Sequence, residues 1–376
     1  MKILAIFGTR PEAVKMCPLI IELKKRDGIE CKICLTGQHR EMLKQVMDCF
    51  SLESDYNLDI MRKNQSLTAI TSEVLLNLEP VLKIERPDIV LVHGDTTSSF
   101  AAALASCYQM IPVGHVEAGL RTGNLFAPFP EEMNRCLTGR LSAVHFAPTK
   151  ENAHNLEKEG VTSPVFITGN TVIDAFKTTV RRDYVFSNTA LQPLVAAAGR
   201  IVLVTAHRRE NLGAPLRQIC LALKRIVEDV EDVSLVYPLH LNPKVRETVI
   251  PILSGVERIF LTEPLDVLDM HNLMARVYMV VTDSGGLQEE APALGKPVLV
   301  LRKETERPEA VKAGTAVLAG VEEEGIYRKA KELLVCKTAY EKMARAVNPY
   351  GDGHASERIA DILQGMTEKE RSVYRE

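Results

Sequence analysis

The run KILAIF at residues 2–7 has the length and apolar character of a buried strand, and the polar turn GTRPE at 8–12 follows it directly. Three more pairs repeat this arrangement: Ile89–Val92 before His93-Gly94-Asp95, Ile201–Val204 before Thr205–Asn211, and Val277–Val281 before Thr282–Gly286. In open α/β sheets, ligands bind outside the carboxyl ends of the strands. The four turns therefore predict one site for a substrate that carries phosphate and reacts by acid–base chemistry.

Strand and helix patterns alternate along the whole chain, as expected of parallel sheets joined by crossover helices. The strands read as continuous apolar runs, such as Val298–Leu301, which is typical of strands covered on both faces. A chain of 376 residues is long enough for two domains. We predict an α/β fold of two Rossmann-like, doubly wound domains with the active site in the cleft between them. The alternation is weakest at 181–199, where we place the connection, and Gly169-Asn170 is an earlier candidate.

Composition excludes several classes of protein. A formal net charge of −3 argues against a general nucleic-acid binder, which would carry a basic excess. No apolar stretch approaches the roughly 18–20 residues that span a bilayer, so we expect no membrane association. The chain enters its first strand at Met1-Lys2, and a signal peptide there would destroy the first motif. We therefore expect a cytoplasmic protein.

No metal or cofactor site is predicted. Cys31 and Cys34 have the Cys-x-x-Cys spacing, but they lie in a strand-like run without a second pair, which favours buried structural thiols. His115-Val116-Glu117 is not followed by the Pro-Cys-x-x-Cys of zinc deaminases. A Gly-x-Gly-x-x-Gly fingerprint for a nicotinamide cofactor is also missing from the sequence.

The turn at 8–12 leads from a strand into a helix, with Pro11 at a favourable first helical position. Backbone N–H groups at a helix start attract anions, and Arg10 and Lys15 add positive charge. A surface turn with a solvated arginine would look the same, so this motif alone leaves both interpretations open.

The turn at 282–286 is a stronger indication of phosphate binding. Gly285 and Gly286 let the backbone approach a ligand closely where the next helix begins. Glu290 is our candidate for holding a ribose diol, whereas Glu289 could equally complement the helix dipole. Arg307 could reach the same phosphates, or it could form a surface salt bridge worth about 0–1 kcal/mol.

Acid–base candidates gather at the other strand ends. Asp95, Glu117 and His207 follow apolar runs, and Glu131 begins a helix. Any single carboxylate in such a place can be a helix cap. Three carboxylates and a histidine are harder to explain as caps, because clusters of this kind separate pKa values into acid and base.

These motifs belong to a longer ordered series: Phe7–Ala13, Gln38–Met42, Val92–Thr97, Gly114–Thr122, Pro130–Arg135, Thr168–Asp174, His207–Asn211, Pro238–Pro243, Thr282–Gly286, Thr305–Glu309 and Asn348–Gly353. In this order they resemble the motifs of the non-hydrolysing UDP-N-acetylglucosamine 2-epimerases. The resemblance covers nearly the whole chain, and the combination is highly specific.

The resemblance implies reversible C2 epimerisation of UDP-N-acetylglucosamine to UDP-N-acetylmannosamine, a precursor of cell-surface polysaccharide, with no nicotinamide and no other cofactor. It carries catalytic roles onto Asp95, Glu117, Glu131 and His207. It carries contacts with UDP onto Arg10, Lys15, His207, Ser284, Gly285, Gly286, Glu290 and Arg307.

The same resemblance implies a fold of the GT-B glycosyltransferase type. Residues 1–170 would form the first domain and residues 171–353 the second, UDP-binding one, with a C-terminal helix in 354–376 packing back on the first. The family usually forms homodimers, and many bacterial members bind a second, allosteric UDP-N-acetylglucosamine. The residues here that match this pocket are Gln38, His39, Gln65, Glu131, Arg208 and His240, and a position that varies between Gln and Glu in the family is Glu41.

Because no carbonyl acidifies the C2 proton of the sugar, we expect the C1–O bond to loosen first. One carboxylate would then take the C2 proton, giving a 2-acetamidoglucal and UDP. Re-addition of UDP with protonation from the other face would complete the inversion. Arg10, His207 and the helix at Gly285 would stabilise charge on the departing diphosphate. The sequence does not assign base and acid among the carboxylates.

Three other functions fit parts of the pattern. A glycosyltransferase would share the fold, since fold does not dictate function, but it predicts an acceptor site and few clustered carboxylates. A hydrolysing epimerase would release free N-acetylmannosamine. A non-catalytic UDP-sugar sensor would leave its ligand unchanged.

Overall fold

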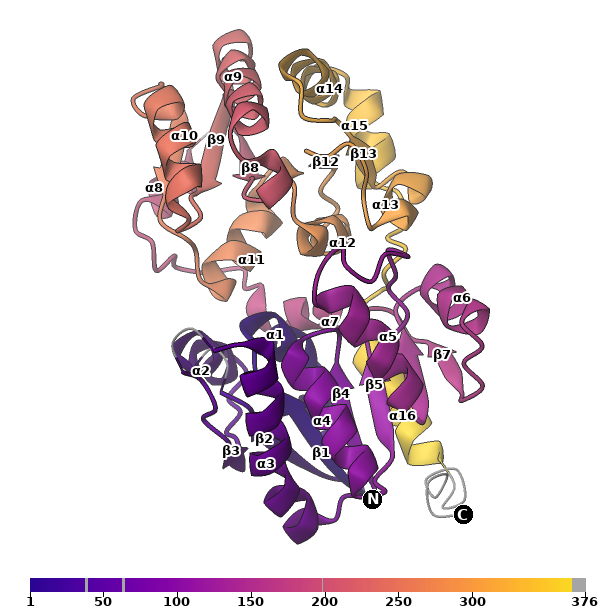
Figure 1. Ribbon diagram of the computed structural model, residues 1–376. Coiled ribbons are helices and arrows are strands. Elements are labelled where there is room, and N and C mark those ends of the chain that lie inside the picture. The colour runs from indigo at the N-terminus through magenta and orange to yellow at the C-terminus, as the bar shows by residue number, and fades with distance from the viewer. Residues whose placement is uncertain (38–39, 63–64, 198, 367–376) are drawn as a thin grey trace. The chain divides into compact units, whose positions relative to one another are not determined.

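The computed structural model describes residues 1–37, 40–62, 65–197 and 199–366 (Figure 1). The chain divides into two compact units, one formed by Met1–Thr178 with Tyr350–Glu376 and the other by Thr179–Pro349. The boundary differs from the one expected between residues 170 and 171. It falls later because the buried Asp174 accepts hydrogen bonds from the backbone N–H groups of Ala355 and Ser356, which ties its helix to the C-terminal segment.

The first unit contains a parallel seven-stranded sheet in the order β3-β2-β1-β4-β5-β6-β7. Its strands are β1 (Lys2–Phe7), β2 (Glu30–Leu35), β3 (Tyr56–Asn57), β4 (Ile89–His93), β5 (Val113–Val116), β6 (Val144–Ala147) and β7 (Val165–Ile167). Its helices are α1 (Arg10–Lys24), α2 (Arg40–Cys49), α3 (Leu67–Glu85), α4 (Thr97–Tyr108), α5 (Glu131–Leu141), α6 (Lys150–Lys158), α7 (Thr171–Thr179) and α16 (Ala355–Gly365).

Continuous apolar strands place this sheet between two helical layers. Ile3–Phe7 of β1 are at most 1% exposed, as expected of a strand covered on both faces. Helices α3, α4 and α5 lie side by side in front of the strands in Figure 1, while α1 contacts α2 and α16. Cys31 and Cys34 lie on β2 among buried residues, and burial raises the pKa of each thiol to about 12. This environment agrees with the structural role expected of them.

The second unit contains a parallel six-stranded sheet in the order β10-β9-β8-β11-β12-β13. Its strands are β8 (Arg200–Thr205), β9 (Val233–Pro238), β10 (Ile259–Thr262), β11 (Met279–Thr282), β12 (Val298–Val300) and β13 (Ala316–Leu318). Its helices are α8 (Leu191–Ala196), η1 (Arg209–Asn211), α9 (Ala214–Asp229), α10 (Pro243–Leu253), α11 (Val267–Arg276), α12 (Gly285–Ala293), α13 (Pro308–Ala313), α14 (Glu323–Val335) and α15 (Lys337–Ala344).

One predicted strand begins later than expected. The apolar run starts at Val277, but the Val277 N–H donates to the carbonyl of Leu273 at 3.0 Å and so closes the last turn of α11. Strand β11 therefore starts at Met279 and ends at Thr282. Among the described residues, no helix is both long and apolar enough to cross a lipid bilayer.

Candidate functional site

Each sheet has one pair of neighbouring strands at which the strand order reverses. The pair is β1 and β4 in the first unit, and β8 and β11 in the second. Parallel sheets bind ligands outside the carboxyl ends of the strands at such a switch point. The turns after these strands are residues 8–12, 93–96, 206–211 and 283–286, so the polar motifs of the sequence lie at the two switch points.

Glu12 joins the two turns of the first switch point. Its Oε2 accepts hydrogen bonds from the N–H groups of Gly8 and Thr9 at 2.9 and 2.7 Å, which completes a capping box at the start of α1. Its Oε1 accepts from the hydroxyls of Thr96 and Ser99 at 2.6 and 2.7 Å. This buried carboxylate therefore holds the turn after β1 against the turn after β4.

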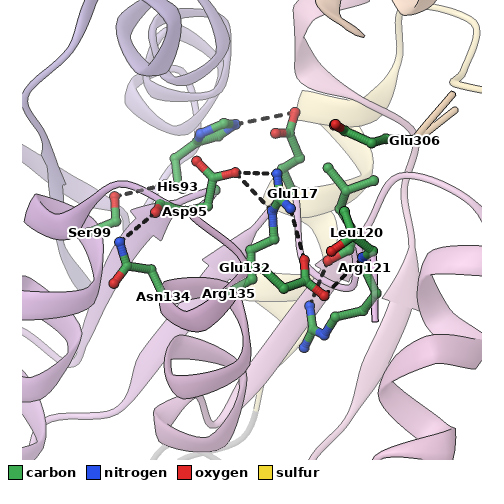
Figure 2. A network of polar contacts seen from close by, with 12 residues as sticks. His93, Asp95, Ser99, Glu117, Leu120, Arg121, Glu132, Asn134, Arg135 and Glu306 are labelled. Atoms are coloured by element: carbon green, nitrogen blue, oxygen red, sulfur yellow. Dashed lines mark hydrogen bonds and ion pairs between the residues drawn. The ribbon is translucent and has the colours of Figure 1, made fainter. Parts of the chain in front are cut away.

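Asp95 is held by a buried arginine of α5 (Figure 2). Arg135 donates from Nε to Asp95 Oδ2 at 2.8 Å, and its Nη2 lies 2.7 Å from the same oxygen. Its Nη1 donates to Glu132 at 3.0 Å, and Glu132 in turn accepts from the N–H groups of Thr122 and Gly123. The arginine thus fixes the position of the Asp95 carboxylate through charge-assisted hydrogen bonds.

Glu117 follows β5 with a backbone φ of 62°, a left-handed conformation that is uncommon for a residue other than glycine. Its Oε2 pairs with the ammonium of Lys15 and accepts a hydrogen bond from Nδ2 of Asn170 at 2.8 Å. Lys15 was expected to contact the diphosphate of UDP. Its ammonium pairs with a carboxylate expected to be catalytic, and its contact with UDP stays a prediction.

The buried His93, at the end of β4, lies next to Glu117. Its Nε2 is 3.7 Å from Oε2 of Glu117, and its carbonyl oxygen lies 2.7 Å from Oγ of Ser99 (Figure 2). Burial lowers the pKa of His93, and the charges that act on it most are those of Glu117, Lys15, Glu12 and Asp95. Glu117 therefore lies next to a neutral imidazole on which the charge of Asp95 also acts, and the catalytic roles of the two carboxylates stay predictions.

Glu131 and Arg10 are the first residues of α5 and α1, and both are half-buried. Pro130, which precedes Glu131, makes no side-chain hydrogen bond to cap α5. The acidic first turn of α5, with Glu131 and Glu132, complements the helix dipole. The ligand roles of Glu131 and Arg10 stay predictions.

In the second unit, Asp283 organises the turn that carries His207. Its Oδ2 accepts hydrogen bonds from the N–H groups of His207 and Arg208, both at 2.8 Å, and from Nδ2 of Asn211 at 2.9 Å. The ring of His207 stacks on that of His240, with centroids 4.9 Å apart and an interplanar angle of 5°. Burial lowers the pKa of His207, the carboxylate of Asp283 raises it, and His240 lowers it.

The first turn of α12 presents groups suited to an anion. Its N-cap, Ser284, makes no side-chain hydrogen bond to the helix. A Cβ at Gly285 would lie 3.3 Å from Cζ of Arg307, so the guanidinium lies against the start of the helix. Arg307 also pairs with the buried Glu289, which makes it more than a solvated surface residue. The helix start and the guanidinium are two groups that can bind an anion, although Glu289 and Glu306 both pair with the same guanidinium.

Glu290, the candidate for holding a ribose, lies next to the same turn. A Cβ at Gly286 would lie 3.1 Å from its Oε1, a tight contact that would require the carboxylate to shift slightly. Its Oε2 is 3.6 Å from Nε2 of the buried His271, whose Nδ1 shares a hydrogen bond with the Thr179 hydroxyl at 2.8 Å. Glu289, by contrast, is an ion-pair partner of Arg307.

Four of the residues expected in an allosteric pocket are described, and one of them, Glu131, begins α5. Gln65 donates from Nε2 to the carbonyl of Ile60 and accepts from the N–H of Arg62, both at 2.8 Å, so its amide is bonded within its own loop. Arg208 and His240 both neighbour His207. Gln38 and His39 lie outside the described residues, and the side chain of Glu41 is not described.

Four further residues of the site had no predicted role, although all lie within the quoted motifs: Arg135, His93, Asn170 and Asp283. The signal for Arg135 was its place three residues after Glu132, the spacing at which helical side chains meet. Asp283 and His93 carried a weaker signal, because both lie at strand ends where side chains point toward a ligand site.

A family model described as "UDP-N-acetylglucosamine 2-epimerase" matches residues 21–364. The UDP-N-acetylglucosamine 2-epimerase of Bacillus subtilis strain 168 is 53% identical over 366 residues, covering 96% of this chain and 95% of the relative. The crystal structure of UDP-GlcNAc 2-epimerase from Neisseria meningitidis bound to UDP-GlcNAc is 48% identical with a TM-score of 0.88, covering 97% and 100% of the two chains.

A more distant neighbour bears on the fold alone. The glycotransferase of kitacinnamycin shares 12% identity with a TM-score of 0.64, covering 96% of this chain and 98% of the other. Two parallel sheets with interleaved helices, together with this likeness, confirm the predicted class of two Rossmann-like domains of the GT-B type.

Proposed function

Because this chain belongs to the UDP-N-acetylglucosamine 2-epimerase family, we propose that it interconverts UDP-N-acetylglucosamine and UDP-N-acetylmannosamine by losing and re-adding UDP. Membership of the family and the enzyme class, an epimerase, are as the motifs predicted. The route by which the C2 centre inverts is the part that we propose here.

The observation that carries this proposal is the pair of carboxylates around His93. Asp95 and Glu117 follow the neighbouring strands β4 and β5. Asp95 is paired with Arg135, and Glu117 is paired with Lys15. Inversion at C2 needs a base on one face of the sugar and an acid on the other. Two carboxylates with different partners at one sheet edge can be tuned for these two tasks.

The second unit supplies the groups for UDP. We propose that the diphosphate binds at the start of α12 beside Arg307, with Glu290 on the ribose. A helix start contributes about 0.3–1 kcal/mol to binding a negative charge, and up to about 2 kcal/mol when partly buried. Gly285 and Gly286 would provide backbone N–H groups. Ser284, whose own N–H donates to Oγ1 of Thr282 at 2.9 Å, would provide its hydroxyl, and His207 and Arg10 would act on the same diphosphate.

The reaction balances without an added oxidant or reductant. The C1–O bond breaks and its electron pair leaves on the diphosphate, while a carboxylate takes the C2 proton and a C1=C2 double bond forms. The intermediates are 2-acetamidoglucal and UDP. UDP then adds back to C1, and a second acidic group, one of Asp95, Glu117 or Glu131, delivers a proton to the opposite face of C2.

Incubation of the purified protein with UDP-N-acetylglucosamine, followed by NMR, tests this proposal. We expect UDP-N-acetylmannosamine to appear until the two sugars reach equilibrium, with traces of UDP and the glycal in step with one another. Free N-acetylmannosamine as the main product would mean a hydrolysing epimerase. Unchanged substrate would mean a binding protein, and transfer only after an acceptor is added would mean a glycosyltransferase.

Two further properties belong to the same proposal. The first is a homodimer, which light scattering tests through the molar mass in solution. The second is activation by a second UDP-N-acetylglucosamine near Arg208 and His240, the two matching residues that adjoin His207. In that case the rate should rise sigmoidally with substrate, and His240→Ala should make the curve hyperbolic. Hyperbolic kinetics in the unaltered protein would remove the allosteric part alone.

A further inference from the structure

Asp283 is a fully buried carboxylate to which the mechanism above gives no task. It follows β11 directly, at the switch point of the second sheet. Its Oδ2 is fixed by three donors, the N–H groups of His207 and Arg208 and the amide of Asn211. This half of the carboxylate therefore holds the turn after β8 in place.

The other oxygen has a different environment. Oδ1 is buried and, within the described part of the chain, receives no hydrogen bond. It lies 3.7 Å from Nδ1 of His207. A buried acceptor without a donor costs about 1–3 kcal/mol, so a small movement of the imidazole toward Oδ1 is favourable. Hydrogen bonds of catalytic groups are often long before a ligand binds.

We propose that Asp283 is the positioning residue of His207, with Oδ1 accepting the Nδ1–H hydrogen bond and stabilising the imidazolium whose Nε2–H faces the diphosphate. This inference rests on the proposed function, in which His207 stabilises the departing diphosphate. The arrangement follows from the two nitrogens of histidine: a partner at one of them sets what the other presents to the ligand. A buried aspartate does this in hydrolytic triads.

The other charged groups that face His207 make such a partner necessary. The ring of His240 stacks on it, and Arg208 is the next residue. Burial lowers the pKa of His207, and His240 and Arg208 lower it further, whereas Asp283 raises it. Asp283 is thus the neighbour that favours the protonated ring.

Asp283→Asn separates positioning from support of the turn. Three donors surround Oδ2, so the asparagine oxygen should take that place and its NH2 group should replace Oδ1. The amide would then donate to Nδ1, which favours the tautomer with hydrogen on Nε2 and opposes the imidazolium. The turn stays intact, and only the state of His207 changes.

Asn211→Ala is the matched control. It removes one of the three donors to Oδ2, and a second hydrogen bond to the carbonyl of Leu301 at 3.1 Å, without touching Oδ1. We expect this variant to lose stability and some activity, with its pH profile unmoved. A purely structural Asp283 would give the same result when replaced by asparagine.

For Asp283→Asn we expect kcat to fall roughly 10²-fold, with KM for UDP-N-acetylglucosamine changed by about twofold or less. The basic limb of the kcat profile should move to lower pH, because the protonated imidazole is lost at a lower pH without Asp283. An unchanged kcat, or a lower kcat with the limb in its original place, would overturn the proposal.

Nitrogen-15 NMR of histidine-labelled protein provides a readout without the variant, with His207→Gln used to assign the signals. We expect hydrogen on Nδ1 of His207 in the unaltered protein. A neutral ring with hydrogen on Nε2 alone would overturn the proposal, even where Asp283→Asn does not fold. If Nδ1 carries hydrogen and the protein has no epimerase activity, the positioning stands and the proposed function fails.

Discussion

Lysine in place of Arg135 would keep a positive charge beside Asp95 and remove the fork that holds it. Nε and Nη2 of the arginine reach one oxygen of Asp95 at 2.8 and 2.7 Å, while Nη1 reaches Glu132 at 3.0 Å. A lysine ammonium is a point charge and cannot span both carboxylates in this geometry. A misplacement of about 1 Å can lower a rate roughly 10²-fold, and we expect a loss of that order in kcat.

The effect on stability should depend on whether the charge is kept. Arg135 is 6% exposed and Glu132 is 1% exposed, so the pair is buried. Removing one partner of a buried pair costs about 3–5 kcal/mol, which we expect for Arg135→Met. Arg135→Lys retains the charge, and we expect it to lower the free energy of unfolding by about 1–2 kcal/mol.

Both quantities are measurable in one set of variants, with kcat from NMR of the sugar nucleotides and unfolding free energies from urea titration. Arg140→Lys is the control on the same helix, since Arg140 is exposed and donates to the carbonyl of Gly160 at 3.3 Å. Its stability should stay within about 0.5 kcal/mol and its kcat should be unchanged. A folded Arg135→Lys with the kcat of the unaltered protein would refute the positioning argument.

Three other predictions follow from single contacts. Lys15→Met should lower kcat roughly 10²-fold, because it removes the cation from Glu117, and should leave the affinity for UDP unchanged. A tenfold loss of UDP affinity in calorimetry would instead show that Lys15 contacts the diphosphate. Gly285→Ala should weaken UDP binding about tenfold, because its Cβ would lie 3.3 Å from Arg307 Cζ and displace the guanidinium; unchanged UDP affinity would contradict this. Burial lowers the pKa of His145 to about 4 in the folded protein. Below pH ~6.5 this histidine therefore binds a proton in the unfolded chain but not in the folded one, and the free energy of unfolding falls with decreasing pH by up to about 1.4 kcal/mol per pH unit. His145→Gln should show a smaller loss of unfolding free energy between about pH 7 and pH 5 in urea titrations, and an equal loss would contradict this.

The strand ends were predictable because the sequence of each buried strand is an apolar run that ends at a polar turn. This pattern located Asp95 and Glu117 after β4 and β5 and His207 after β8. It also located Gly285 at the start of a helix, because the apolar run of β11 stops a few residues earlier and the next helix begins there. Periodicity and turn chemistry are local signals, and these positions depend on local structure.

The partners of these residues were not predictable in the same way. Arg135 reaches Asp95 across 40 residues, and Asp283 reaches the turn of His207 across 76. Such pairs depend on which strands become neighbours in the sheet. The order of strands in a sheet cannot be read from local sequence patterns. The boundary between the units depends on the same kind of contact, because Asp174 binds the start of α16 across 182 residues.

Epimerisation of UDP-N-acetylglucosamine in D2O tests the central claim most directly, because proton removal and return at C2 involve groups that exchange with solvent. We predict that every molecule of UDP-N-acetylmannosamine formed carries deuterium at C2, and that Asp95→Asn and Glu117→Gln each lower the rate of this incorporation roughly 10²–10⁴-fold. Product that retains the original hydrogen at C2 would contradict the account.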